Sequence, residues 1–87
     1  MPYRIKIIAD RHGFYHPPQY LLSIDVDFAG GIGLARLTRN PDDALVFPDL
    51  ASLMETWKAR STVRPWRLDG KPNRPLTAYT IEPELID

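Results

Sequence analysis

Only one stretch of the chain, residues 48–59, has apolar side chains at the spacing of an amphipathic helix. Its large apolar residues recur at positions i, i+3, i+4 and i+7, and they are Leu50, Leu53, Met54 and Trp57. Pro48 suits the first helical position, where its missing amide hydrogen costs nothing, and Asp49 suits the positive end of the helix dipole. We therefore expect one helix that lays this stripe across the inner face of a sheet.

Alternating apolar and polar residues predict half-buried antiparallel strands at residues 3–9 and 20–28. In the second strand, the inward face would comprise Leu22, Ile24, Val26 and Phe28. The outward face would comprise Leu21, Ser23, Asp25 and Asp27. Because a slip of one residue would bury both aspartates, we expect this register to be strongly specified.

Glycine and proline residues predict the connections between these strands. Residues 10–19 contain a glycine and two adjacent prolines, which exclude a helix and indicate an ordered loop or a hairpin connection. Gly30 and Gly31 supply the positive φ that a tight hairpin turn requires. The returning strand, at about residues 33–38, has its leucines out of phase, which suggests a bulge or a strand covered on both faces.

Two shorter segments lie on either side of the helix. Residues 44–47 could form a helical turn or a short strand, and we favour the turn because Ala44 and Phe47, three residues apart, would both point inward. Residues 76–81 are rich in β-branched and aromatic side chains, which predicts a last strand that Pro83 closes.

These segments predict a single α+β domain over residues 1–87. We expect a mostly antiparallel three- to four-stranded sheet with one helix packed on one face, in the order β-β-β-α-β. A chain of 87 residues forms one modest core with little room for a deep cleft, and the absence of cysteine excludes disulfides and thiolate catalysis. We expect no enzymatic activity and no cofactor.

No apolar run approaches the roughly 20 residues of a membrane span. The amino terminus also lacks the apolar core and the cleavage site of a signal peptide. We therefore expect a cytoplasmic protein that has no membrane partner.

Positive charge is concentrated between the helix and the last strand. The net charge of the chain is zero, yet residues 57–74 carry six basic side chains and only one acidic side chain, Asp69. Acidic stretches flank this segment on both sides, so part of the charge will pair internally. We expect the remaining basic side chains to form a binding surface, and the candidates are Arg64, Arg67, Lys71 and Arg74.

Trp66 lies among these basic residues and allows two interpretations. Its indole could stack on a nucleic-acid base while neighbouring cations hold phosphates. Alternatively, it fills the gap between helix and sheet, and the surrounding prolines stiffen a long crossing loop. We favour the second interpretation because a domain this small needs the apolar area of the indole.

Two other pairs of residues have spacings typical of functional sites. His12 and His16 are four residues apart, but the intervening glycine and the following proline disfavour a helix and no third ligand is evident, so we predict no metal site. Asp25 and Asp27 share the outer face of a predicted strand, where acidic residues usually prevent edge pairing. They form a secondary candidate surface for binding.

The run DGKPNRPLTAY at residues 69–79, together with the T-x-N-P-x-x-A-x-x-F spacing at residues 38–47, resembles small uncharacterised proteins encoded by bacteriophages and prophages. The resemblance covers roughly the second half of the chain. It implies a phage or prophage origin and expression in a bacterial cytoplasm. It supplies no catalytic residue and no ligand.

Two functional hypotheses follow. The first is a non-catalytic protein-interaction module that acts on a host protein or protein complex, as an inhibitor of a bacterial defence complex for example. The alternative is an accessory protein that binds nucleic acid through the basic loop between the helix and the last strand. A dedicated nucleic-acid-binding protein usually carries a net basic excess, which this chain lacks, so we favour the first.

Overall fold

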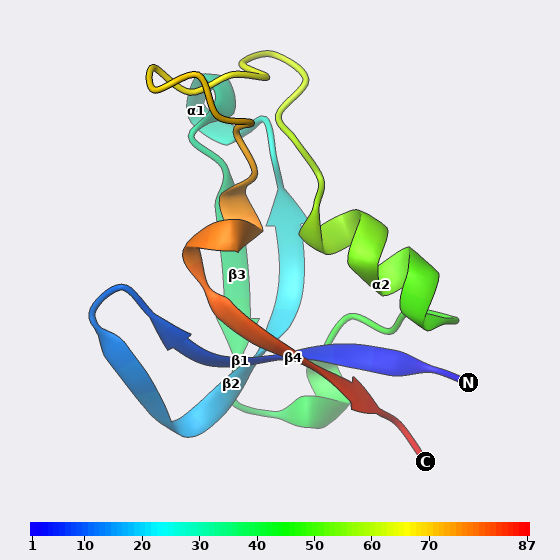
Figure 1. Ribbon diagram of the computed structural model, residues 1–87. Helices are drawn as coiled ribbons and strands as arrows, with labels where there is room; N and C mark the ends of the chain where they lie inside the picture. Colours follow the sequence, from blue (N-terminus) through cyan, green and yellow to red (C-terminus); the bar gives the residue numbers. More distant parts are fainter.

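The computed structural model describes all 87 residues as a four-stranded antiparallel sheet with one main helix (Figure 1). The strands are β1 (Tyr3–Asp10), β2 (Gly13–Asp25), β3 (Leu34–Thr38) and β4 (Thr80–Leu85), and the main helix is α2 (Leu50–Trp57). The sheet order is β3-β2-β1-β4, and the predicted α+β class and β-β-β-α-β order are confirmed. Short turns are α1 (Phe28–Gly31), η1 (Pro41–Asp43) and η2 (Pro75–Ala78). None of the helices is long and apolar enough to cross a membrane.

Strand β1 lies inside the sheet and pairs with β2 on one side and β4 on the other. Ile5 and Ile7 are fully buried, while the alternating residues Arg4, Lys6 and Ile8 are only partly buried, as the period of two predicts. On the partly covered side, the Arg4 guanidinium forms an ion pair with Glu84 of β4 and lies 5.3 Å from the ring centre of Tyr20. Apolar packing on one face and polar contacts on the other therefore fix this strand.

Strand β4 begins later than predicted and contains a proline. Residues expected to start the strand form the short turn η2 instead, which buries Leu76. Pro83 does not close the strand but lies within it, opposite Ile5. An edge strand tolerates proline because one row of its amides has no partner in the sheet.

Strand β2 begins at Gly13, so the connection after β1 is a hairpin, which was one of the two predicted alternatives, and most of residues 10–19 lie in the strands and not in a loop. Strands β1 and β2 form a tight hairpin, in which Asp10 pairs with Gly13 and Ala9 with Phe14. The next pair joins Ile7 to Gln19, and the two adjacent prolines lie in the stretch between these pairs. No strand pairing is formed in this stretch, so the amide hydrogens that the prolines lack leave no hydrogen bond of the sheet unmade.

A bulge in β2 changes which side chains point inward. Leu21 opposes Leu37 and Ser23 opposes Arg36, so Leu22 is an extra residue on its strand. Leu21 is consequently fully buried while Leu22 is 40% exposed, which reverses the predicted faces at this point. The expected bulge lies in β2 and not in the returning strand.

The helix begins at Leu50, two residues later than predicted. The Asp49 carboxylate accepts a hydrogen bond of 2.8 Å from the Ser52 amide, so Asp49 is the cap and Pro48 precedes it. Leu53 is fully buried, and Met54 and Trp57 pack partly buried against the core. The predicted stripe is therefore confirmed except at Leu50, which is 44% exposed.

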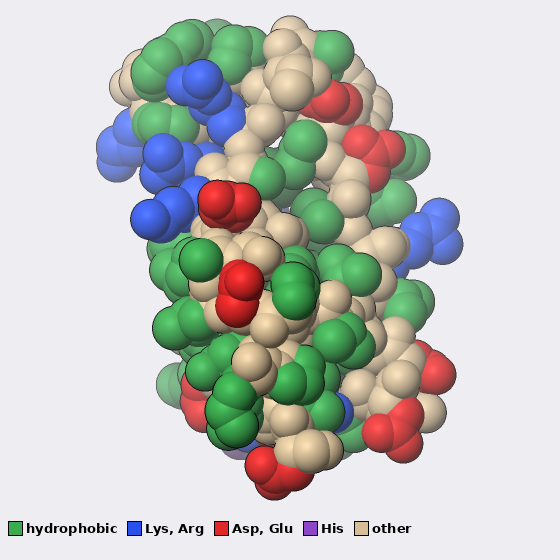
Figure 2. Space-filling model, turned by 90° about the vertical axis from the view of Figure 1, so that its right-hand side faces the viewer, with side chains coloured by type: hydrophobic (Ala, Val, Ile, Leu, Met, Phe, Trp, Pro, Cys, Tyr) green, Lys and Arg blue, Asp and Glu red, His purple; other side chains and the backbone are tan.

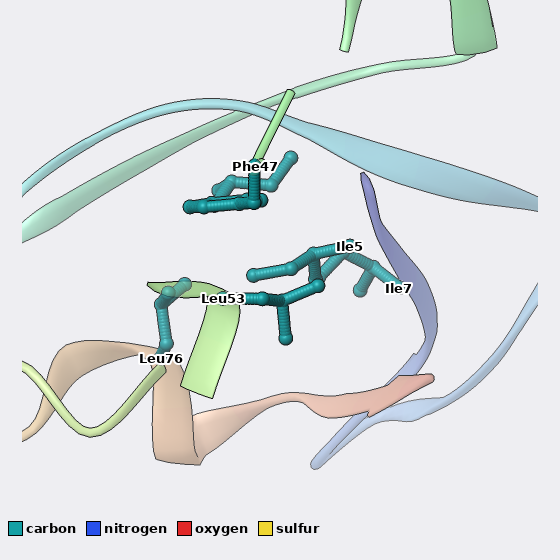
Figure 3. Close-up of a cluster of buried hydrophobic side chains, with 6 residues drawn as sticks. Ile5, Ile7, Phe47, Leu53 and Leu76 are labelled. Carbon is teal, nitrogen blue, oxygen red and sulfur yellow. The ribbon is translucent and has the colours of Figure 1, made fainter. Parts of the chain in front are cut away.

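The core is one cluster between the sheet and the segments that cross it (Figure 3). It comprises Ile5, Ile7, Leu21, Phe47, Leu53 and Leu76. Figure 3 shows the isoleucines of β1 next to Leu53 of α2, with Phe47 and Leu76 closing the cluster. Side chains from well-separated parts of the chain thus form a single small hydrophobic centre.

The segment before the helix is extended, so the preferred helical turn at residues 44–47 was wrong. Phe47 and Tyr3 exchange two backbone hydrogen bonds of 2.8 Å, which makes a short antiparallel bridge. The Leu45 amide donates to the Leu21 carbonyl at 2.9 Å. Ala44 and Phe47 are both buried, as expected, but in an extended segment that bonds to strands β1 and β2 and not in a helical turn.

Candidate functional site

Residues 61–74, here called the end loop, project at one end of the molecule as the yellow and orange loop of Figure 1. The loop folds back on itself as a small hairpin. The Arg67 amide donates to the Lys71 carbonyl at 2.8 Å, and the Asn73 amide donates to the Pro65 carbonyl at 3.0 Å. A bridge between Trp66 and Pro72 completes the pairing. The loop therefore has a defined backbone although it forms no strand of the main sheet.

Asp27 holds the beginning of the end loop. Its carboxylate accepts hydrogen bonds from the Ser61 hydroxyl at 2.9 Å, the Thr62 amide at 2.7 Å and the Thr62 hydroxyl at 2.6 Å. The Val63 amide donates a further bond of 3.2 Å. Hydrogen bonds from the Thr62 and Ser61 side chains lower the pKa of Asp27 to about 2. This carboxylate is thus a structural anchor that stays ionised at neutral pH.

The pair of aspartates does not share a strand face, as the sequence suggested. Strand β2 ends at Asp25, and Asp27 lies in the following turn with its carboxylate directed to the end loop. Asp25 accepts a hydrogen bond of 3.1 Å from the Asp27 amide. Phe28, also expected in the strand and on its inner face, is 47% exposed in α1. The turn therefore replaces the predicted end of the strand.

The connection between β2 and β3 packs tightly beneath the end loop. It is a hairpin connection, as predicted, but it is longer than a tight turn and includes α1. Gly31 has φ 103°, and a Cβ there would lie 2.5 Å from the Cβ of Arg64. The Asn73 side-chain amide bridges the two segments by donating to the carbonyls of Gly31 at 2.5 Å and Arg64 at 2.9 Å. Only glycine permits this approach of the two backbones.

All four basic candidates are exposed on or next to this loop, and they are Arg64, Arg67, Lys71 and Arg74. Arg67 pairs with Asp69 at 3.2 Å, whereas the other three form no ion pair. Figure 2 shows most of the basic side chains of that face near its upper left, next to hydrophobic side chains, which also occur over the rest of the face. The segment carries an excess of positive charge that the protein itself does not neutralise.

Two adjacent hollows connect these residues. Arg64 and Arg67 line a hollow of about 420 Å³ whose other walls include Gly31, Ile32 and Leu68. A second hollow of about 300 Å³ lies between Arg67, Arg74 and Ile32. Arg67 and Ile32 are common to both, while Lys71 lines neither. The structure therefore brings three of the predicted candidates around neighbouring depressions and leaves the fourth outside them.

Trp66 does not fill the gap between helix and sheet, and the favoured interpretation was wrong. The side chain is 55% exposed, and the Arg60 guanidinium lies 5.1 Å from its ring centre. Hydrogen bonds hold the end loop, so the indole is not needed as internal packing. Other large side chains are also exposed around the loop: Ile32 at 69%, Val63 at 64% and Leu68 at 96%.

Ile32 and Leu68 are members of the site that the sequence did not identify. Leu68 precedes the Asp69 and Gly70 pair at the tip of the end loop, and a single leucine beside a turn carries no distinguishing signal. Ile32 comes from the β2–β3 connection, more than 30 positions away in the chain. Only the folded arrangement places it against the basic residues.

The two histidines are exposed at the other hairpin. The Arg11 side chain donates to the His12 ring nitrogen Nε2 at 3.3 Å, and the His16 ring lies 6.3 Å from the ring of Phe14. No group of three or more histidine, cysteine or acidic side chains is arranged to hold a metal ion.

Comparisons with known proteins identify no relative, since no family model, no curated protein and no solved structure matches this chain.

Proposed function

We propose that the protein is a non-catalytic protein-interaction module that binds through the end loop and the adjoining Ile32. The observation that carries this proposal is the combination of exposed apolar side chains and unpaired basic side chains on one hydrogen-bonded loop. Large exposed apolar groups usually mark interaction surfaces when they gather in one place. A loop whose backbone is already fixed also loses little conformational entropy on binding.

The partner that fits this surface best is a protein with a local acidic region. A long polyanion such as a nucleic acid would extend beyond the end loop and meet repulsion from acidic segments. Residues 40–56 carry a net charge of minus four and residues 75–87 of minus three. A protein can place its acidic groups opposite the end loop alone. The resemblance to phage proteins extends this proposal to a bacterial host protein or defence complex.

The experiment is a capture of partners from bacterial lysate with three forms of the full-length protein. The unmodified protein is compared with the double variant Arg64→Glu and Arg67→Glu, and with a control double variant Arg36→Glu and Arg39→Glu. All four arginines are exposed, so the two variants change charge equally. We expect one specific protein to be captured by the unmodified and control forms and lost from the end-loop variant.

Two results would contradict this proposal. Capture that survives reversal of both end-loop arginines would place the interaction surface elsewhere. Circular dichroism monitors folding of the variants. Loss of the folded state in the end-loop variant would show that the two arginines are needed for folding and not for binding. The melting temperature is expected to be nearly unchanged, since exposed charges contribute little to stability.

A second candidate function is the binding of single-stranded nucleic acid. The specific observation in its favour is the exposed Trp66 indole beside basic side chains, because bases stack on such rings. Affinity for a single-stranded oligonucleotide that falls steeply as salt is raised, and that is lost in Trp66→Ala, would favour this function over the first.

A further inference from the structure

We infer that the partner docks by inserting a carboxylate side chain into the hollow between Arg64 and Arg67, with an apolar neighbour on Ile32 and Leu68. This inference rests on the proposed function and specifies the chemistry of the segment that would be recognised: an acidic and apolar peptide segment of another protein. Charge and shape at this single hollow are the observations that support it.

The charge of the hollow is positive and incompletely satisfied. Arg64 forms no ion pair, and Arg67 shares its charge with one exposed aspartate, Asp69, at 3.2 Å. No other acidic residue lines the hollow, so two guanidinium groups face one carboxylate. A second carboxylate from outside would balance the charge, and arginine binds carboxylates through paired, directional hydrogen bonds.

The backbone and Cβ of Arg64 are held by Gly31, Ser61 and Asn73. Its Cβ packs over Gly31, where no side chain could fit, and its amide donates to the Ser61 hydroxyl at 3.0 Å. Its carbonyl accepts from the Asn73 side chain at 2.9 Å. These contacts hold the backbone and Cβ of Arg64, whereas its guanidinium forms no ion pair. Such preorganisation reduces the cost of binding.

The walls of the hollow explain why the carboxylate should have an apolar neighbour. Ile32 is 69% exposed and Leu68 is 96% exposed, and both line the same depression as the arginines. Covering them would remove apolar surface from water next to the ion pair, which strengthens the pair by excluding solvent. A depression of about 420 Å³ suits one or two inserted side chains better than the flat surface of a bilayer.

The test uses the full-length protein labelled with ¹⁵N and observed by NMR. The probe is a short peptide that alternates glutamate with leucine, and the matched control peptide has glutamine at every glutamate position. We expect the glutamate peptide to shift the amides of Gly31, Ile32, Arg67 and Leu68. We expect the glutamine peptide to bind at least about tenfold more weakly, which corresponds to the loss of one charge-assisted pair.

Two variants connect the effect to the hollow. Arg64→Gln removes the unpaired charge, and Leu68→Ser removes the apolar wall; each is expected to weaken the glutamate peptide several-fold while the remaining spectrum keeps its folded dispersion. Arg36→Gln is the control and should bind normally. Equal binding of both peptides, or binding unaffected by Arg64→Gln, would overturn the inference.

The outcomes also separate this inference from the proposed function. Partner capture that depends on the end loop, combined with no response to the glutamate peptide, would leave the interaction function in place and overturn the carboxylate inference. Preferential binding of a single-stranded oligonucleotide or of anionic phospholipid vesicles would overturn it as well.

Discussion

The hydrophobic core between the sheet and α2 is held together by apolar packing, whereas the end loop is held mainly by hydrogen bonds. Around the helix, buried side chains from five segments form one apolar cluster, most of which Figure 3 shows. At the end loop, the internal contacts are hydrogen bonds to Asp27 and Asn73 and close approaches over glycine, while the large apolar side chains point outward. One region buries its large apolar groups in the core, and the other leaves them exposed to solvent.

This difference explains how a small chain can keep a rigid but apolar surface exposed. A loop that depended on Trp66 or Leu68 for its own packing would have to bury them and could not offer them to a partner. Polar anchors on the inner side of the loop remove that conflict. The comparison therefore predicts that substitutions at chemically identical residues will have very different effects in the two regions.

The largest contrast is expected between two leucines. Leu53→Ala removes a fully buried side chain of the core and should lower the free energy of unfolding by about 2 to 5 kcal/mol. Leu68→Ala changes a residue that is 96% exposed and should alter that free energy by less than about 0.5 kcal/mol. Urea denaturation of both variants measures the difference. Similar losses in the two variants would show that the end loop is part of the core.

The second-largest effect is expected where Gly31 of the β2–β3 connection approaches Arg64 of the end loop. Gly31→Ala combines a positive φ of 103° with a Cβ only 2.5 Å from the Cβ of Arg64. Gly70→Ala has a comparable φ of 82° but meets nothing within 4 Å, so it isolates the backbone cost of about 1 kcal/mol. We expect Gly31→Ala to be clearly more destabilising in thermal unfolding. Equal melting temperatures would mean that the loop relaxes away from Gly31.

A smaller effect depends on pH. Folding lowers the pKa of Asp27 from an ordinary value of about 3.9 to about 2, so the ionised carboxylate stabilises the folded state above the higher value. That contribution is lost as the pH falls through the lower value. Asp27→Asn keeps the shape and removes the titration. The stability advantage of the unmodified protein over this variant should be full at neutral pH and disappear near pH 2.

Urea denaturation of both proteins at several pH values measures that difference. Asp10 and Asp49 also have lowered pKa values, from hydrogen bonds with Tyr15 and with Ser52 respectively. Both are present in the variant, so their effects cancel in the comparison. A constant difference between the two proteins from neutral pH to pH 2 would show that the charge of Asp27 does not hold the end loop.

The same contrast separates what the sequence could predict from what it could not. Local periodicity identified β1 and the stripe of α2, because both elements bury one face of a regular structure. It failed in β2, where a bulge at Leu22 changes the face and two prolines lie outside the ladder pairs. These features depend on the partner strand, which no local pattern reveals.

The site shows the limit more clearly. The charge distribution identified the basic residues, and the structure places Arg64, Arg67 and Arg74 around adjacent hollows. The role of Asp27 could not be predicted, because its partners are more than 30 positions away. Because the sequence does not reveal these hydrogen bonds, it favours a buried Trp66 as the residue that holds the loop in place. Long-range polar contacts, which leave no periodic pattern in the sequence, hold the end loop and allow Trp66 to be exposed.

The last comparison concerns the two tryptophans. Trp66 is 55% exposed, and the Arg60 guanidinium lies 5.1 Å from its ring centre. Trp66→Ala should therefore cost at most about 1 kcal/mol in urea denaturation. Trp57 packs against the core, and Trp57→Ala should cost several times more, about 3 to 5 kcal/mol. Fluorescence provides a second measurement, because Trp57→Phe leaves Trp66 as the only indole. Its emission should be quenched readily by acrylamide in the folded protein. Protection from acrylamide, or a loss in Trp66→Ala as large as in Trp57→Ala, would return Trp66 to the interior and remove the distinction between the two regions.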